Sequence, residues 1–188
     1  MKNGKFSKLE IELDSMVKAD QAIIAKLKSS TEGEKDSLLQ LQQRILRSNT
    51  TRAKEILRES GFPGYNKVSK NSSSNFWLIV QHSDHDLKFQ KEVLSILENE
   101  VEMGNASIFD YAYLKDRVRV NEGLPQIYGT QVYYDSLDNP HPKPLENPED
   151  VNTLRMSIGL EPLEQYLMLL KINRTSGDTI KGDFFITH

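Results

Sequence analysis

Apolar residues recur at steps of three and four along most of this sequence, and a glycine or proline ends one such run after another. In the first run, Leu9, Leu13 and Val17 fall on one face of a helix. Gly61 and Pro63 end a later run, because glycine accepts a left-handed conformation and proline cannot continue a helix. The pattern predicts a mainly α protein, a single-domain, helical, bundle-like fold of about seven helices with a small β-hairpin or ribbon.

The helical periodicity can be placed on the chain segment by segment. Asn49 or Thr50 is expected to cap the third helix, and Asn105 or Ser107 a later one. Residues 74–83 are apolar on every side, which suits a central helix or, as the alternative, a buried strand. The other predicted helices cover residues 7–29, 34–48, 49–60, 84–103, 105–120, 150–158 and 162–171.

The remaining segments have the composition of loops and short strands. Residues 64–75 are rich in Lys, Ser and Asn and are predicted to form a loop. Residues 126–134 favour a strand but contain a glycine, which predicts a short strand or irregular ribbon that pairs near residues 143–145. The apolar residues 184–186 predict a short edge strand.

Composition limits the classes of protein open to this chain. Its 188 residues, of which 37% are hydrophobic and 27% charged, suit one globular domain that covers residues 1–188. A formal net charge of −3 argues against a nucleic-acid-binding protein, which normally presents a basic face. The absence of cysteine excludes disulfides, thiolate zinc sites and a cysteine nucleophile.

The distribution of apolar residues also bears on location. No apolar run approaches the roughly 18 residues that a membrane span requires, and the N-terminus lacks the apolar stretch of a signal peptide. We therefore expect a soluble, cytoplasmic protein that binds neither membrane nor nucleic acid. The sequence leaves its oligomeric state and any cofactor unknown.

Five polar residues occupy positions that helical periodicity assigns to the core: Asp20, Gln81, His82, Gln90 and Asp116. A buried polar group without a partner costs about 1–3 kcal/mol, so such groups persist mainly where they satisfy one another or a ligand. Three explanations are open. The five residues can form a hydrogen-bonded network that fixes helix packing, they can line a ligand or catalytic pocket, or the helical phase is misassigned.

Several short motifs surround these polar residues. They are QHSD at residues 81–84, Gln90 six residues later, AYLKDRV at residues 112–118 and GLPQIYGTQ at residues 123–131. Asp20-Gln21, Gly61-Phe62-Pro63, and Asn152 and Arg155 ahead of Gly159-Leu160 extend the pattern. With these motifs the chain resembles, over nearly its whole length, a bacterial protein family of uncharacterised function. The resemblance implies that the polar residues belong to one shared site, and it implies no activity, substrate or cofactor.

The residue types suggest roles at such a site. His82 is the best general acid or base, because histidine alone titrates near neutral pH without perturbation. Asp116 or Asp84 is expected to orient it, and Arg117 and Arg155 to hold an anionic group of a substrate. The predicted ligand-binding residues are Asp20, Gln81, Gln90, Arg117, Gln126, Tyr128, Gln131 and Arg155.

These roles predict a small-molecule-binding protein or an enzyme with hydrolase-like acid–base chemistry, whose pocket lies between central helices and is covered by residues 123–131. The alternative is a non-catalytic interaction module in which the same polar network is structural. His82, Asp84 and His85 carry metal-binding atoms, but their spacing matches no zinc motif, so no metal is predicted. The serine-hydrolase elbow, the P-loop and the dinucleotide-binding glycine motif are all missing from the sequence.

Overall fold

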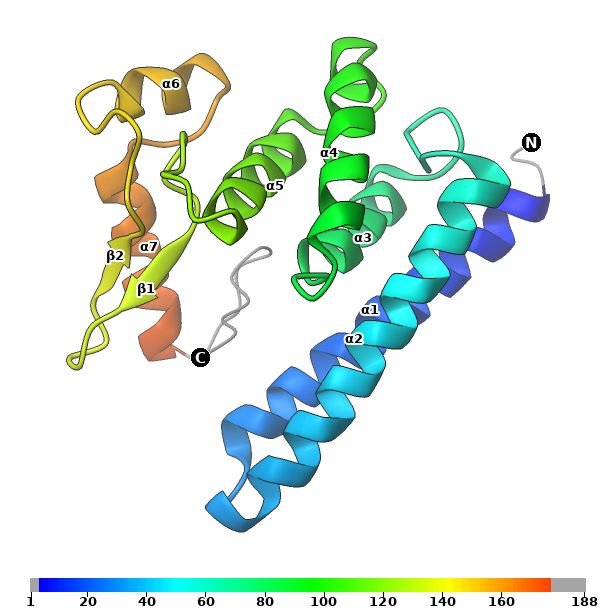
Figure 1. Ribbon diagram of the computed structural model, residues 1–188, viewed down its shortest axis with the longest axis horizontal. Helices are drawn as coiled ribbons and strands as arrows, with labels where there is room; N and C mark the ends of the chain where they lie inside the picture. Colours follow the sequence, from blue (N-terminus) through cyan, green and yellow to red (C-terminus); the bar gives the residue numbers. More distant parts are fainter. Residues whose placement is uncertain (1–3, 177–188) are drawn as a thin grey trace. The chain divides into compact units, whose positions relative to one another are not determined.

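The computed structural model of the chain describes residues 4–176. The chain divides into two compact units, unit 1 (Met1–Ser107) and unit 2 (Ile108–His188). The part of the chain that the structure describes contains seven α-helices and one two-stranded antiparallel sheet (Figure 1). The predicted mainly helical fold with a small β-hairpin is therefore confirmed, whereas the single domain stays a prediction. The edge strand predicted at residues 184–186 lies outside the described residues.

Unit 1 is built on a long helical hairpin. Helices α1 (Gly4–Ser29) and α2 (Glu32–Ser60) lie side by side, and a bond from Arg52 Nε to Glu12 Oε1 (2.6 Å) joins them (Figure 1). Helix α3 (Lys70–Gln81) packs against both members of the hairpin, and α4 (Leu87–Glu102) contacts α3. No helix among residues 4–176 combines the length and apolar character needed to cross a membrane.

Helix α2 is continuous where the sequence predicted two helices with a boundary at Asn49 or Thr50. Both side chains are engaged in contacts that leave the helix intact. Thr50 Oγ1 donates to the Leu46 carbonyl one turn back and lies 2.8 Å from Ser83 Oγ, and Asn49 Nδ2 donates to the Met16 carbonyl of α1 (3.3 Å). Residues with capping side chains therefore serve tertiary packing here, which explains why the prediction of a break is wrong.

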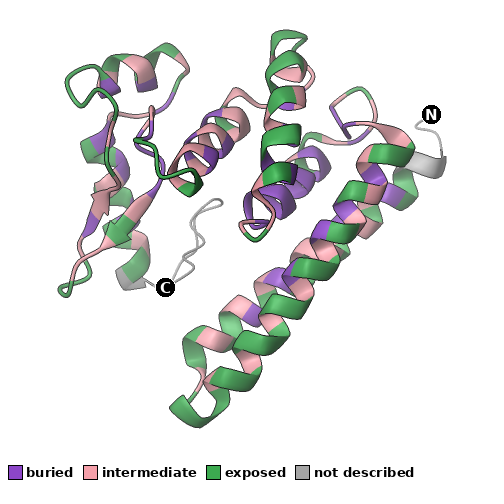
Figure 2. Ribbon diagram, viewed as in Figure 1, coloured by how far each residue is buried: buried purple, intermediate pink, exposed green. Residues whose placement is uncertain are grey.

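Residues 74–81 of the segment 74–83 belong to a helix and not to a strand. Helix α3 starts at Lys70, earlier than predicted, because the Ser69 side chain accepts a hydrogen bond from the Ser72 main-chain N–H (3.2 Å). The apolar residues 76–80 are all buried, so this short helix forms the centre of unit 1 (Figure 2). Its C-terminal end positions Gln81 and His82 inside the protein.

The turn after α2 brings two distant segments into close contact. Gly61 has a positive φ of 67°, as its predicted place at the helix end requires, and its N–H donates to the Leu57 carbonyl. At Gly64 a Cβ atom would lie 2.2 Å from Asn105 Nδ2 and 2.8 Å from the Asn105 carbonyl oxygen. The neighbouring Tyr65 N–H donates to that same carbonyl (2.9 Å). Only glycine at position 64 permits this approach of main chain to main chain.

Unit 2 combines three helices with the hairpin. Helix α5 (Ile108–Asn121) leads into an irregular ribbon, strand β1 (Val132–Tyr134) and strand β2 (Pro140–Pro142), followed by α6 (Val151–Ser157) and α7 (Leu163–Ser176). The strands are antiparallel, with Tyr133 opposite His141. The buried core of this unit comprises Val151, Leu163, Tyr166 and Leu170.

The regular strands are shorter than the predicted segments: β1 occupies only the last three residues of 126–134, and β2 lies just before the predicted partner residues 143–145, which bond to the ribbon instead. Regular pairing starts at Val132, and residues 126–131 contribute a single parallel bridge between Gln126 and Leu145. In the turn, the Asp135 carboxylate accepts hydrogen bonds from the side chain and main chain of Asn139 and lies 3.1 Å from His141 Nε2. These contacts hold the pKa of Asp135 below its ordinary value, and the hydrogen bond from the Asn139 side chain has the largest effect.

Gly64→Ala tests the contact between the two main-chain segments of unit 1. We expect this variant to lose about 1–3 kcal/mol of unfolding free energy in urea denaturation, because the added methyl group meets main chain that has to shift. The control is Gly33→Ala in α2, where a Cβ has nothing within 4 Å. That change should stabilise the protein slightly, by about 0.5–1 kcal/mol, because alanine is the better helix former. Equal stability of both variants would show that residues 64 and 105 are not in contact.

Candidate functional site

All five polar residues assigned to the core by periodicity are buried. Their exposed fractions are 3% for Asp20, 3% for Gln81, 6% for His82, and 0% for Gln90 and Asp116. This result confirms the predicted helical phase. The polar residues at core positions are therefore not the product of a misassigned phase, and a packing network and a ligand site remain as explanations. Asp20, Gln81, His82 and Gln90 belong to unit 1 and Asp116 to unit 2.

The central contact of unit 1 is a hydrogen bond between Asp20 and His82. Asp20 lies on α1 and His82 is the residue that ends α3, and the packing of these two helices brings Asp20 Oδ2 within 2.6 Å of His82 Nδ1. A carboxylate accepts at this position, so Nδ1 is the protonated nitrogen of the imidazole. In the neutral ring Nε2 then carries the lone pair, as a general base requires.

Three side-chain atoms, one of Asp20 itself and two of residues adjacent in sequence to the pair, are buried and make no hydrogen bond with any residue that the structure describes. They are Asp20 Oδ1, Gln21 Nε2 and Gln81 Oε1. Each such atom costs about 1–3 kcal/mol unless a water molecule or ligand satisfies it. Gln21 was not among the predicted ligand-binding residues, although the Asp20-Gln21 motif already pointed to it.

The segment that carries His82 is held from two sides. Ser83, fully buried, donates from its hydroxyl to the Ile79 carbonyl (2.8 Å) and contacts Thr50 Oγ1 of α2. On the other side, Gln90 of α4 donates from Nε2 to the Val80 carbonyl (3.1 Å). These contacts connect the end of α3 to both neighbouring helices, so the imidazole stands on a rigid support.

Gln90 has a positioning role in this arrangement. Besides the Val80 carbonyl, its Nε2 lies within 3.2 Å of the Gln81 carbonyl and of Asp84 Oδ1. The carbonyls at the end of a helix have no partner within the helix, and the Gln90 amide supplies one. Gln90 and Asp84 therefore support the loop after α3 directly, whereas their predicted contacts with a ligand or with His82 stay predictions.

His85, the other histidine of this segment, is exposed. Its pKa is lowered, first by partial desolvation and then by the positive charge of Arg47. Within residues 4–176 the structure contains no group of three or more His, Asp or Glu side chains that could hold a metal ion.

In unit 2 the carboxylate of Asp116 organises the ribbon between α5 and β1. Its Oδ1 accepts from the main-chain N–H of Ile127 (2.7 Å), and its Oδ2 accepts from the N–H and the hydroxyl of Thr130 (both 3.0 Å). The Tyr128 N–H lies 3.1 Å from both oxygens. Burial raises the pKa of Asp116, and the hydrogen bonds from Thr130, Tyr128 and Ile127 act in the opposite direction. The same bonds explain why residues 127–130 form no ladder with a neighbouring strand.

The two glutamines of the GLPQIYGTQ block satisfy each other and the main chain. Gln126 Oε1 accepts from the Gln131 N–H and Gln126 Nε2 donates to the Gln131 carbonyl, both at 2.8 Å. Gln131 in turn accepts from Arg117 Nη1 at Oε1 (3.0 Å) and donates to Thr130 Oγ1 (3.0 Å). The block is therefore a closed hydrogen-bonded loop around Asp116.

Arg155 is fully buried and binds main-chain oxygens. Its Nε donates to the Glu161 carbonyl (2.6 Å) and its Nη1 to the Tyr128 carbonyl (2.7 Å), while the guanidinium lies 4.9 Å from the centre of the Tyr166 ring. This side chain ties α6 to the ribbon and to α7. The structure places Arg117, Gln126, Tyr128, Gln131 and Arg155 together with Asp116 in unit 2.

Comparison with known proteins identifies the family. Residues 7–177 match the model of a family of unknown function, DUF6624, and the chain belongs to this family. The predicted relation to an uncharacterised family is thereby confirmed. No curated protein and no solved structure matches the chain.

Asp116→Asn tests the role of this carboxylate in unit 2. The amide keeps the size of the side chain but replaces one acceptor oxygen by an NH₂ group, which leaves buried N–H groups unsatisfied. We expect a loss of at least about 3 kcal/mol and rapid amide hydrogen exchange at residues 127, 128 and 130. The control Glu149→Gln removes a charge from an exposed position of the same unit and should change neither quantity. Retained protection in Asp116→Asn would contradict the role proposed for its carboxylate.

Proposed function

We propose that this protein binds a polar small molecule beside Asp20 and His82, and that His82 acts on it as a general base in hydrolase-like chemistry. The observation that supports the proposal is the buried carboxylate–imidazole pair, with a 2.6 Å bond between Asp20 Oδ2 and His82 Nδ1. Three buried polar atoms that no described residue satisfies belong to this pair and its neighbours. A buried network that served only packing would satisfy its own members.

The proposed chemistry follows from the orientation of the imidazole. Asp20 holds the proton on Nδ1, so Nε2 is the atom that accepts a proton from a water molecule or from a substrate hydroxyl. The resulting imidazolium keeps its Nδ1–H directed at the Asp20 carboxylate, which stabilises the new positive charge. The hydroxide or alkoxide attacks the substrate, and the imidazolium returns its proton to the leaving group.

The buried atoms without partners determine which ligand groups the proposed site prefers. Gln81 Oε1 and Asp20 Oδ1 accept hydrogen bonds, whereas Gln21 Nε2 donates one. A ligand with hydroxyl or amide groups satisfies both kinds of atom. The roles of Arg117, Arg155 and the other residues of unit 2 as ligand contacts stay predictions from the sequence.

The alternative function, a non-catalytic interaction module with a structural polar network, draws support from unit 2. There Asp116, Gln126 and Gln131 satisfy one another and the main chain, as in a network that only fixes packing. The two functions differ in what they require of unit 1. An interaction module needs the Asp20–His82 pair for stability alone, whereas a binding site needs it for a ligand.

A thermal-shift screen of metabolites and nucleotides on the wild-type protein and on His82→Gln tests the proposed function. The variant keeps the approximate size and hydrogen-bonding capacity of the side chain, so we expect it to fold. Ligands that raise the melting temperature of the wild type should lose this effect in His82→Gln and in Asp20→Asn. A ligand that stabilises wild type and His82→Gln equally binds elsewhere, and unfolding of the variant favours the structural alternative.

Gln81→Met separates the two functions by stability. In a ligand site the Gln81 amide oxygen has no partner in the protein alone, so its removal should leave the unfolding free energy unchanged or increase it by about 1 kcal/mol. The same variant should fail to respond to ligands found in the screen. Gln90→Met is the matched control, because its amide donates to the Val80 carbonyl and its loss should destabilise by about 1–3 kcal/mol. Destabilisation of Gln81→Met to the same extent would show that its amide serves packing.

A further inference from the structure

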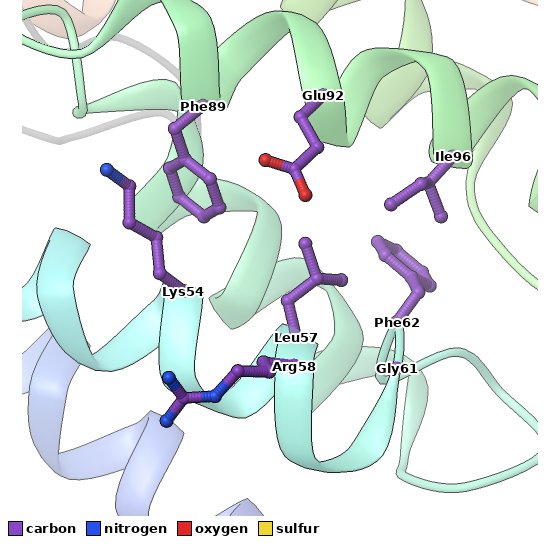
Figure 3. A pocket seen from close by; sticks show the side chains of 8 residues that line it. All are labelled: Lys54, Leu57, Arg58, Gly61, Phe62, Phe89, Glu92 and Ile96. Carbon is purple, nitrogen blue, oxygen red and sulfur yellow. The ribbon is translucent and has the colours of Figure 1, made fainter.

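A cavity of unit 1 lies between α2 and α4 beside the turn that follows α2 (Figure 3). Its volume of about 430 Å³ falls within the range of small-molecule sites, roughly 300–1,000 Å³. It is lined by Lys54, Leu57, Arg58, Gly61, Phe62, Phe89, Glu92 and Ile96. None of the residues placed beside the Asp20–His82 pair is among them, so this cavity is a separate feature.

The floor of the cavity is apolar and rigid. Leu57 and Phe62 form it on the side of α2, and Phe89 and Ile96 on the side of α4. Phe62 and Phe89 are buried in the core of the unit, with exposed fractions of 4% and 1%. Phe62 also packs edge-to-face against Phe76 of α3, with ring centres 5.7 Å apart. Core packing thus holds Phe62 and Phe89 in place, and the partly buried Leu57 and Ile96 supply most of the accessible apolar surface of the floor.

Two charged side chains reach this floor, Lys54 from α2 over the Phe89 ring and Glu92 from α4. Figure 3 shows the Glu92 carboxylate between Phe89 and Ile96, pointing from α4 towards Leu57. Glu92 forms no hydrogen bond or ion pair with any residue in the described part of the chain. A carboxylate therefore faces an apolar surface without a counter-ion from the residues that the structure describes.

The two cations of the lining do not neutralise Glu92. The Lys54 ammonium group is bonded to Asp86, at the start of α4, and lies 5.5 Å from the centre of the Phe89 ring. The hydrogen bond from Lys54 lowers the pKa of Asp86, which keeps that carboxylate ionised as its partner. In Figure 3 the Arg58 guanidinium points away from the other lining side chains. Glu92 is thus the charged side chain over the floor that has no ion-pair partner among the described residues, whereas Lys54 is paired with Asp86.

We propose that this cavity binds a small organic cation, a primary amine carried on an apolar or aromatic body. The ammonium group pairs with the Glu92 carboxylate, and the body covers the floor formed by Leu57, Phe62 and Ile96. Aromatic ring faces also attract cations, as the position of Lys54 over Phe89 illustrates. The proposal is independent of the function proposed for the Asp20–His82 pair, since the two sites share no residue.

Calorimetric or NMR titration of the full chain with three probes of similar size tests the charge preference. The probes are phenethylamine, phenethyl alcohol and 3-phenylpropionate, which carry a positive charge, no charge and a negative charge. We expect saturable binding of phenethylamine with a Kd of about 1 mM, as is typical of a ligand with so few atoms. Phenethyl alcohol should bind about five-fold more weakly, and 3-phenylpropionate more weakly still. Absence of saturable amine binding up to about 10 mM, or tighter binding of the carboxylate, would overturn the proposal.

Variants of Glu92 assign the binding to this cavity. Glu92→Gln should weaken the binding of phenethylamine about five-fold. Glu92→Lys should reverse the preference, so that 3-phenylpropionate binds better than the amine. Glu92 is exposed on α4, so neither change threatens the fold. The control is Glu98→Gln, which removes the same charge from an exposed position of the same helix outside the cavity lining. If Glu98→Gln weakens the binding of phenethylamine as much as Glu92→Gln does, the effect comes from net charge and the proposed site is refuted.

Discussion

The hydrogen bond between Asp20 and His82 joins two residues that are 62 positions apart and determines how the centre of unit 1 is arranged. The Asp20 carboxylate could not be buried alone, because an isolated charge in the interior costs several kcal/mol, and the buried N–H of the imidazole needs an acceptor. Together they connect the middle of α1 with the end of α3. Ser83 and Gln90 then attach that end to α2 and α4, so all four helices of the unit meet around one imidazole.

The two polar clusters of the molecule differ in how completely they are satisfied. The Asp116 carboxylate in unit 2 is surrounded by donors from a single ribbon, and the neighbouring glutamines bond to each other. In unit 1 the Asp20–His82 bond is accompanied by acceptor and donor atoms without partners among the described residues. Among the described residues of unit 2, one buried side-chain atom, Arg155 Nη2, also makes no hydrogen bond, but Asp116, Gln126 and Gln131 leave no such atom. This contrast is the reason why the proposed chemistry is placed at His82.

The sequence predicted the helices well, because most of them are bounded by caps, glycines or prolines whose effect is local. It failed at Asn49 and Thr50, whose capping potential is overridden by contacts with α1 and with Ser83. Helical phase was sufficient to predict that Asp20 and Asp116 are buried.

The partners of these groups could not be predicted from the sequence in the same way. They depend on how helices far apart in the chain pack, so the residue bonded to His82 Nδ1 is Asp20, whereas Asp116 and Asp84 were expected to orient the ring. Gln21 was missed as a candidate for a similar reason. Its place beside Asp20 was visible in the sequence, but the burial of its amide nitrogen is a property of the packed helices.

The unbroken course of α2 has a consequence for communication within unit 1. Thr50, which contacts Ser83 beside the imidazole, and Lys54, which lines the cavity between α2 and α4, are one helical turn apart, about 6 Å along the axis. A regular helix transmits a shift over such a distance almost undiminished. If an occupant of either location displaces α2, the other location experiences the same displacement, and the resulting linkage must act with equal strength in both directions.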